Sequence, residues 1–300
     1  LRPPDADRDF DVPGAALAAL GLFSLLVALS RGGAWGWTAR PTLVSGVLGI
    51  VALALFVRHE ARTPHPMVDL RLLRRRALAT ANLAAMASSA ALFGTLILLP
   101  FYLTAVMGFD PVELALGITP IAASFVLVAP VAGRSIARVG SDRLATAGFV
   151  VAAAGALWMA LSSGSQDYAA VLPGIVGLGV GLAMSTAPIT ATAIHDVPQA
   201  RLGVASALPN ISRYTGGALG AAILGAVLHA GLAAGLDRAG GRVGEAGREA
   251  VAAGFRNALL VAAGLLALAA LAAARMPRLD ARGPGVAAGE DMAVATRAAR

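Results

Sequence analysis

Residues 78–107 read LATANLAAMASSAALFGTLILLPFYLTAVM, a stretch that contains no charged side chain. A helix needs about 20 apolar residues to cross the ~30 Å hydrocarbon core of a bilayer, and this stretch exceeds that length. It also lacks the polar face of a helix on the surface of a soluble protein. Similar runs, separated by short charged or Gly/Pro-rich connections, lie at 13–30, 42–57, 113–132, 144–161, 168–194, 203–232 and 255–274. We therefore expect an all-α integral membrane protein with about eight transmembrane helices.

The composition supports membrane insertion. Of the 300 residues, 57% are hydrophobic and only 14% are charged, whereas a soluble domain carries about 25% charged residues. A soluble bundle of buried helices does not account for this sequence, because the runs have no polar face to present to water. Lipid is therefore the solvent for much of the chain.

The distribution of arginine predicts the orientation. All 24 basic residues are Arg, and the cytoplasmic loops of membrane proteins are enriched in basic residues. With the N-terminus placed in the cytoplasm, 17 Arg fall inside, 6 fall outside, and Arg213 lies within a span. We therefore expect both termini to be cytoplasmic. The net charge of +7 is interpreted as this topology signal and not as a nucleic-acid interface, because no basic stretch is interleaved with aromatic residues.

The connections divide the chain into segments. Residues 1–11 form a charged cytoplasmic connector that does not begin with Met, so we interpret the chain as part of a longer protein. A helix pair at 12–57 is followed by a basic cytoplasmic loop at 58–77 and by a six-helix bundle at 78–275. The Ala-, Gly- and Arg-rich tail at 276–300 is predicted to be disordered.

Signatures of catalysis and metal binding are missing from the sequence. The chain has no cysteine, which excludes disulfides and thiolate metal ligands. It contains none of the motifs H-E-x-x-H, G-x-x-x-x-G-K-[ST] or G-x-S-x-G. The four histidines do not pair at ligand spacing. We therefore predict neither enzymatic activity nor a metal site.

Glycine and proline recur in the apolar runs. Six prolines lie in or near the ends of runs and are expected to kink helices, because each removes a backbone donor. They are Pro100, Pro120, Pro130, Pro173, Pro188 and Pro209. Glycines cluster at 174–181 and 216–220, and such small residues let helices pack closely. Gly-rich helices also occur where helices rock against each other, so both interpretations remain open from the sequence.

A short basic connection follows the run at 113–132. It reads GRSIARVGSDR and carries Gly133, Arg134, Arg138, Gly140 and Arg143. One interpretation is anchoring by positive charge on the cytoplasmic side. The connection also resembles the loop signature G-x-x-x-[DA]-R-x-G-x-[KR]-[KR] of the major facilitator superfamily, in its degenerate C-terminal copy. That resemblance implies that the arginines bond helix-end carbonyls and a neighbouring carboxylate and so latch one conformation. Ala137 stands where the stronger N-terminal copy has Asp, so the charge relay is expected to be incomplete.

Further stretches resemble one branch of that superfamily, the fourteen-helix drug:proton antiporters (EmrB/QacA type). They follow one another in order from about Asp11 to Pro277. They include GW at 36–37, PMVDL at 66–70, LPFYL at 99–103, RLGVASA at 201–207 and GGALG at 216–220. Thr104 and Tyr214 depart from the pattern, since Gln is usual at both positions.

The resemblance implies an architecture and a function. The first two helices correspond to a linker pair and the other six to the C-terminal bundle of a major facilitator fold, so the N-terminal bundle of the same chain is expected to be missing. It implies a transporter of the bacterial inner membrane that exports drugs or other amphipathic small molecules, with the proton gradient and no cofactor as energy source. The expected partners are lipid, substrate, protons and the N-terminal bundle, with no nucleic acid. A dedicated exporter of one endogenous metabolite and a non-transporting membrane scaffold remain alternatives.

A substrate cavity between two bundles is expected near the middle of the membrane. Aromatic and Met side chains offer an adaptable surface for varied apolar substrates, although helix packing also accounts for them. The lining residues expected from this chain are Phe93, Tyr102, Thr119, Met184, Asn210 and Arg213. No acidic residue lies at mid-membrane depth, where a proton relay needs one. In the family the main proton-binding carboxylate belongs to the N-terminal bundle.

Arg213 has two interpretations. It lies about 15 Å along a helix from Gly203, and an Arg at the membrane centre costs about 2.5–3.5 kcal/mol on insertion scales. If the bilayer portion begins near Pro209, residues 210–232 still span the membrane and Arg213 reaches the phosphates of the inner leaflet. Alternatively Arg213, with Asn210 one turn earlier, faces the cleft and meets a carboxylate of the missing bundle.

The predicted orientation can be tested with single cysteines, because the chain has none of its own. Ser165→Cys should react with a membrane-impermeant thiol reagent added from outside, and Arg75→Cys should not, because the Arg excess places residue 75 in the cytoplasm. Labelling of intact cells measures both. The reverse pattern, or labelling at both positions, would contradict the orientation.

Overall fold

The computed structural model describes residues 11–36, 38–63, 76–165, 167–194, 202–238 and 245–277. Within these residues the chain forms eight helices and no strand. The helices are α1 (Val12–Trp35), α2 (Arg40–Glu60), α4 (Arg76–Met107), α5 (Pro111–Val139), α6 (Ser141–Ser162), α7 (Tyr168–Ile194), α8 (Leu202–Arg238) and α9 (Glu245–Ala274). Each is long and apolar enough to cross a bilayer. The prediction of an all-α protein with about eight transmembrane helices is confirmed.

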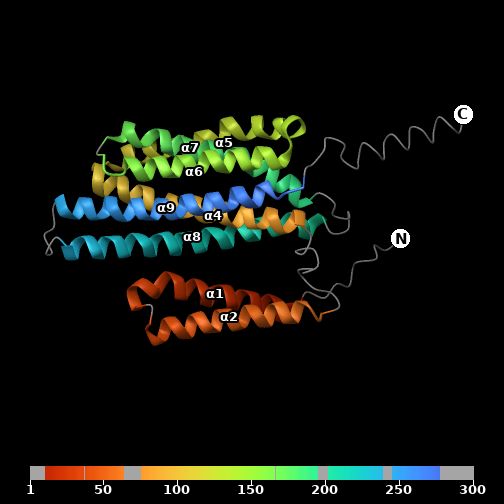
Figure 1. The fold of residues 1–300 in the computed structure, drawn as a ribbon. Helices are drawn as coiled ribbons and strands as arrows, with labels where there is room; N and C mark the ends of the chain where they lie inside the picture. The colour runs from red at the N-terminus through yellow and green to blue at the C-terminus, as the bar shows by residue number, and fades with distance from the viewer. Residues whose placement is uncertain are drawn as a thin grey trace, which may run out of the picture.

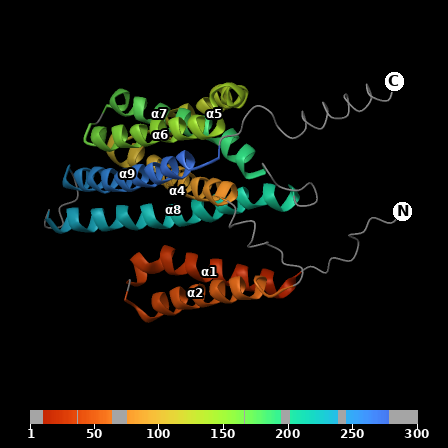
Figure 2. The same cartoon turned by 45° about the vertical axis from the view of Figure 1, so that its right-hand side comes forward.

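The helices run side by side in two groups. α1 and α2 form a hairpin, and α4 to α9 form a bundle (Figure 1). The hairpin contacts the bundle through α1 and α8, and the turned view shows the same order of helices (Figure 2). α1 begins and α9 ends at the same end of the molecule, as an even number of spans requires.

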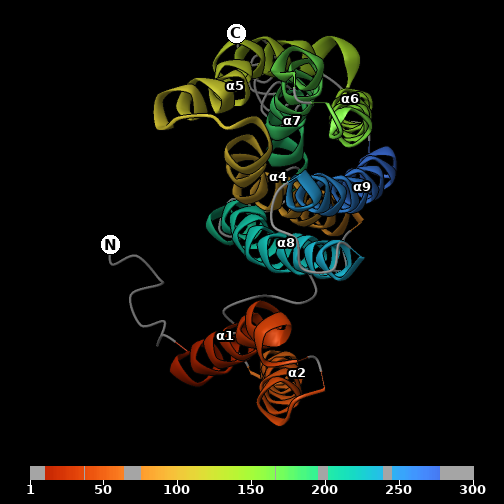
Figure 3. The same ribbon diagram turned by 90° about the vertical axis from the view of Figure 1, so that its left-hand side faces the viewer.

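α4 lies near the centre of the bundle when the molecule is viewed along its helices (Figure 3). It packs against α8 and α9 on one side and against α7 on the other, while α6 packs against α7 and α9. Half of each apolar span is buried in α4, α6 and α7, but only 17% is buried in α2 and α5. We infer that α2 and α5 present most of their apolar surface to lipid.

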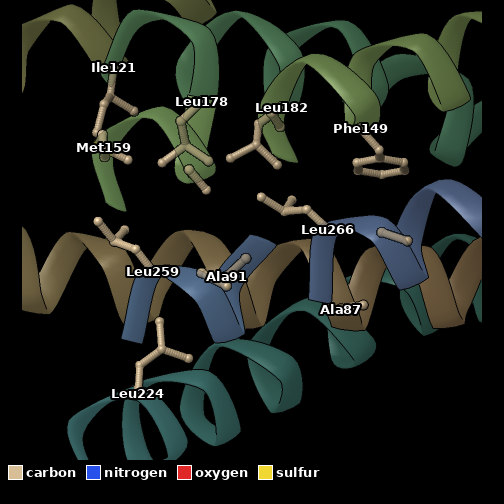
Figure 4. Close-up of a cluster of buried hydrophobic side chains, with 14 of the residues drawn as sticks. Ala87, Ala91, Ile121, Phe149, Met159, Leu178, Leu182, Leu224, Leu259 and Leu266 are labelled. Carbon is tan, nitrogen blue, oxygen red and sulfur yellow. The ribbon is translucent and has the colours of Figure 1, made fainter. Parts of the chain in front are cut away.

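The apolar core lies where α4, α6, α7, α8 and α9 meet. Leu178 and Leu182 point from α7 toward Leu259 and Leu266 of α9, and Leu224 approaches from α8 (Figure 4). All five side chains are at most 5% exposed. These contacts hold the helices through van der Waals packing, because lipid tails are as apolar as leucine and give little hydrophobic drive for helix association.

Glycines bring α8 directly against α4. A Cβ on Gly216 would collide with the carbonyl oxygen of Met86, and a Cβ on Gly220 would collide with that of Ala90. The two backbones therefore touch at these positions, an approach that only the smallest residues permit. The glycine cluster at 216–220 thus serves close packing in this structure.

Capping contacts define several helix ends. At the start of α5, the carboxylate of Asp110 accepts from the N–H of Glu113 at 2.8 Å, and the Glu113 carboxylate accepts from the N–H of Asp110 at 3.0 Å. Asp11 caps α1 by accepting from the N–H of Gly14 at 2.9 Å. It also lies 3.0 Å from Nε2 of His59 at the end of α2. The bond from Gly14 and the contact with His59 lower the pKa of Asp11, and they tie together the two ends of the α1–α2 hairpin.

The connection at 133–143 is mostly helical, which corrects the expectation of a short loop. α5 continues to Val139, and α6 begins at Ser141. Gly140 alone separates them, with a φ of +91° that is readily accessible only to glycine. Its N–H donates to the carbonyl oxygen of Ile136 at 2.9 Å. The apolar run ends before the helix does, because backbone hydrogen bonding continues through charged residues.

Other helices also extend beyond their apolar runs. α2 covers 21 residues and exceeds the predicted run at 42–57 at both ends. α9 begins at Glu245, well before its apolar run. Polar turns add helix outside the hydrocarbon core, so hydropathy underestimates helix length. Most of the segments predicted at 1–11, 58–77 and 276–300 falls outside the described residues.

We expect Gly220→Ala to destabilise the bundle. The added Cβ meets the backbone of Ala90, which cannot move without displacing α4, and overpacking of this kind costs about 1–3 kcal/mol. Gly225→Ala is the matched control on the same helix, because nothing lies within 4 Å of its Cβ position. The measurement is the thermal midpoint of the purified protein in detergent, followed by circular dichroism. Equal midpoints for the two variants would show that α8 tolerates a larger distance from α4.

Candidate functional site

A cavity of about 130 Å³ lies within the bundle between α4, α5, α6, α7 and α8. Its apolar wall consists of Leu92, Phe93, Phe125, Phe149, Leu182 and Ile189. Its polar wall consists of Ser88, Ser89, Ser185, Thr186 and Arg213. Small-molecule sites commonly combine a mostly apolar lining with a few placed polar groups. This cavity is therefore the candidate substrate site.

The guanidinium of Arg213 crosses from α8 to α7. Its Nη2 donates to Oγ1 of Thr190 at 3.2 Å, and its Nη1 lies 3.5 Å from Oδ1 of Asn210 on its own helix. Thr190 is one turn before the end of α7 at Ile194. The guanidinium is thus part of the cavity wall and lies toward the end of the bundle at which α7 ends. Both interpretations of Arg213 stay open, because the guanidinium lines the cavity and also lies toward the end of the bundle.

Hydroxyl groups in the cavity donate to their own helices. Ser88, Ser185 and Thr186 donate to carbonyl oxygens about one turn earlier, at 3.2, 2.8 and 2.9 Å. A hydroxyl that donates to the backbone keeps its oxygen available as an acceptor. The cavity therefore offers hydroxyl acceptors on α4 and α7, and Arg213 is its one charged donor among the described lining residues.

The structure brings three of the predicted substrate residues together. Phe93 and Arg213 both line the cavity, and Asn210 contacts Arg213. Met184 lies outside the lining and packs toward α6, where its Cβ is 3.0 Å from the position of a Cβ on Gly148. Thr119 is exposed on α5, and its hydroxyl donates to the carbonyl of its own helix one turn earlier. The predicted residues thus lie on helices that line the cavity, but Thr119 and Met184 do not belong to its lining.

Tyr102 does not reach the cavity, which corrects the prediction that it lines it. Its side chain is fully buried and stacks on Phe255 of α9, with 4.2 Å between ring centroids. Its hydroxyl donates to the carbonyl oxygen of Ser163 at 2.8 Å. Tyr102 thus joins α4, α9 and the turn after α6, because α9 covers the face of α4 on which it lies.

Several cavity residues were missed by sequence reasoning. Phe125, Ser89, Ser185, Thr186 and Thr190 all line the cavity or contact Arg213. The sequence contains one indication of these residues, namely two adjacent polar residues inside an apolar run. A hydroxyl that faces lipid has no partner other than its own helix, so such a pair favours a position inside the protein. Ser88-Ser89 and Ser185-Thr186 are such pairs.

The basic residues predicted as a conformational loop gather at one end of the bundle. Arg134 and Arg138 are exposed about one turn apart on α5, and Arg143 is exposed in the first turn of α6. Gly133 has open space around its Cβ position, whereas Gly140 makes the turn between the helices. A latch between these arginines and a carboxylate stays a prediction.

Acidic residues are absent from the cavity wall in the described part of the chain. None of its lining residues is acidic. Asp110 and Glu113 lie in the capping box at one end of α5, and Asp142 lies in the first turn of α6 at the other end of the bundle. The described residues also contain no group of three His, Asp or Glu that could hold a metal ion. They thus provide the cavity with a cation but with no proton-binding carboxylate.

Comparison with known proteins identifies similar sequences. Residues 12–221 match the profile described as Major Facilitator Superfamily. The chain is 32% identical over 225 residues to the multidrug resistance protein B homolog of Mycobacterium tuberculosis, with 74% of this chain and 42% of that protein covered. It is 34% identical over 218 residues to the multidrug resistance protein Stp of the same organism, with 73% and 40% covered.

A relative from a second genus is the tetracenomycin C resistance and export protein of Streptomyces glaucescens. Identity is 30% over 224 residues, with 75% of this chain and 42% of that protein covered. The chain therefore spans about two-fifths of the length of these relatives.

We expect a cysteine in the cavity to sense the charge of Arg213. Thr186→Cys places a thiol on the cavity wall, where the guanidinium should favour an anionic methanethiosulfonate reagent over a cationic one of similar size. A unit charge at about 4 Å contributes roughly 1 kcal/mol in water, with opposite sign for the two reagents, so the ratio of the two labelling rates should fall about 30-fold on Arg213→Gln.

Thr192→Cys is the matched control on α7, because Thr192 is fully buried and lies outside the cavity lining. It should react slowly with both reagents. Since the chain has no native cysteine, the labelling rate reports the introduced thiol alone. A rate ratio that is unchanged by Arg213→Gln would place the guanidinium away from the cavity.

Proposed function

The chain belongs to the major facilitator superfamily, within its drug:proton antiporters, and from this premise we propose that it forms one helix bundle of a proton-coupled exporter of drugs or other amphipathic small molecules. The observation that carries the proposal is the cavity between α4, α5, α6, α7 and α8, which combines three Phe side chains with one Arg. Such a lining suits a molecule that is mostly apolar and carries a polar or charged group.

The lining favours an aromatic substrate that carries acceptor oxygens. The rings of Phe93, Phe125 and Phe149 provide apolar and stacking contacts, and the guanidinium of Arg213 donates charge-assisted hydrogen bonds. At about 130 Å³, the cavity encloses only part of a drug-sized ligand, whose pockets measure about 300–1,000 Å³. We therefore propose that a second bundle supplies the opposite wall.

We place the proton-binding carboxylate on that second bundle. The relatives are more than twice as long as the matched part of this chain, and no acidic residue lines the cavity on the described side. A carboxylate that faces Arg213 from the other bundle would lose its proton more readily beside the cation. The ionised carboxylate and an acceptor group of the substrate would then compete for the same guanidinium, which couples the protonation of the carboxylate to substrate binding.

The proposed location is the bacterial plasma membrane. The apolar spans of α2 and α5 are the least buried of the eight helices, as expected of helices in a membrane. One end of the bundle carries Arg134, Arg138 and Arg143. We place this end in the cytoplasm, in accordance with the excess of Arg in cytoplasmic connections. Both termini then lie in the cytoplasm.

A dedicated exporter of a single metabolite is the second candidate. It is supported by the similarity to a relative that is named for tetracenomycin C resistance and export. A non-transporting scaffold is less well supported, because packing alone does not require an Arg in the wall of a cavity.

Transport measurements test the one-bundle role. We expect no proton-driven dye efflux from vesicles that contain this chain alone, because access cannot alternate around a cavity with one wall. Joining the chain to the part of the Mycobacterium tuberculosis multidrug resistance protein B homolog that the similarity does not cover should restore efflux. Efflux by this chain alone would contradict the one-bundle role and indicate a homodimer that supplies both walls.

The joined protein also tests Arg213. Arg213→Ala should abolish efflux, and Arg213→Lys should retain the charge and part of the activity, since Lys keeps the cation but loses the planar donor geometry. Protein abundance in the membrane is measured for each variant. Normal efflux by the Ala variant at equal abundance would leave Arg213 with an anchoring role only.

A further inference from the structure

A second recess lies at the opposite end of the bundle from Gly140. It encloses about 330 Å³ between the end of α4, the turn after α6 and the first part of α9. Ser163 and Gly164 form its wall on the α6 side, and Arg248, Glu249 and Arg256 line it from α9. None of these residues lines the cavity described above.

The three charged side chains share one side of α9. Arg248 and Arg256 are eight residues apart, which is slightly more than two helical turns. Ala252 and Ala253 lie between them in the lining and leave space over the helix. Arg248, Glu249 and Arg256 are exposed, and no hydrogen bond or ion pair to another described residue occupies them. They are therefore available to an external ligand.

The recess lies at the level where the membrane-spanning helices end. α4 ends at Met107 and α6 ends at Ser162, both next to the recess. Trp158, one turn before the end of α6, is half exposed, and its indole N–H donates to the carbonyl of Ala170 at 2.9 Å. Exposed Trp side chains mark the headgroup region of a bilayer. The charged residues of the recess therefore lie at the level expected for lipid headgroups.

The wall of the recess is held in place from within the bundle. The hydroxyl of Tyr102 donates to the carbonyl oxygens of Ser163 and Ser165, at 2.8 and 3.2 Å. Its ring stacks on Phe255, the neighbour of Arg256 on α9. Both sides of the recess are therefore fixed to the same buried side chain, so a ligand meets a preformed site.

We propose that this recess binds the headgroup of phosphatidylethanolamine. Arg248 and Arg256 supply the donors that phosphate oxygens require. Glu249 supplies an acceptor for the primary ammonium group. A choline headgroup has no N–H to donate to this carboxylate, and a glycerol headgroup carries no cation. Two guanidinium groups beside one carboxylate match a phosphate linked to an ammonium better than either alternative.

Titration of the purified full chain in detergent tests the proposal. Dioctanoyl phosphatidylethanolamine, dioctanoyl phosphatidylcholine, dioctanoyl phosphatidylglycerol and inorganic phosphate are each added and followed by isothermal titration calorimetry. The ethanolamine lipid should bind about tenfold more tightly than the other two lipids, as the loss of one charged hydrogen bond predicts. Inorganic phosphate should bind far more weakly than any of the lipids, because it lacks the acyl chains that contact the bundle.

Variants assign the individual contacts. Arg256→Gln should weaken binding of the ethanolamine lipid about tenfold, and Arg248→Gln should act in the same direction. Arg40→Gln is the matched control, since Arg40 is exposed at the same end of the molecule but outside the recess, and it should leave affinity unchanged. Glu249→Gln should remove the preference for ethanolamine over choline. Circular dichroism midpoints verify that each variant is folded.

Three outcomes would overturn the proposal. Equal affinities of folded Arg256→Gln and Arg40→Gln proteins would show that the recess does not bind the phosphate. Phosphate that binds as tightly as the lipid would identify a site for soluble anions. A preference for ethanolamine that survives Glu249→Gln would exclude the ammonium contact. None of these results depends on transport, so the proposed export function is tested separately.

Discussion

The hydrocarbon core of a bilayer offers the peptide backbone no hydrogen-bond partner, and the rest of the structure depends on that constraint. Each unsatisfied N–H or C=O would cost several kcal/mol in lipid, so a spanning segment must satisfy its backbone internally. The described spans are accordingly all helical. Polar side chains follow the same rule, because hydroxyls such as those of Ser124 and Thr192 donate to carbonyls of their own helix, at 2.7 and 2.8 Å.

Once the helices form, their spacing is decided by side-chain size. Gly216 and Gly220 bring α8 against α4, and a comparable contact joins α6 and α7, where a Cβ on Gly155 would lie 2.7 Å from the carbonyl oxygen of Gly174. Large side chains separate the helices elsewhere. The cavity is bounded by Phe93, Phe125 and other bulky residues, so tight contacts and open space follow from the same alternation of small and large residues.

Charge is confined to the edges of the described bundle. Arg213 lies toward one end, where it contacts α7, and Arg248, Glu249 and Arg256 lie at the other end, in the recess at the ends of α4 and α6. Both groups sit beside polar or aromatic residues that are anchored in the core. The export function and the lipid site are therefore proposed for two separate places in the same bundle.

The sequence by itself determined how many helices cross the membrane, and for a physical reason: crossing depends on length and hydropathy, which are local properties. It also singled out Arg213 and Phe93, which both line the cavity in the structure; their role in substrate binding stays a prediction. The family was recognised from motifs spread along the chain and was then confirmed by comparison. The charged residues at 133–143 predict a loop but are mostly helical in the structure, because hydropathy marks the edge of the lipid and not the end of a helix.

Only the tertiary structure decided which way each side chain faces. These helices are apolar on every side, since lipid and protein core are equally apolar, and no amphipathic pattern distinguishes the face toward α9 from the face toward a cavity. Tyr102 was therefore assigned to the cavity and in fact stacks on Phe255, and Met184 faces α6. The hydroxyl pairs at 88–89 and 185–186 came together only when α4 and α7 packed against each other, because the rotation of a helix about its axis is set by its neighbours.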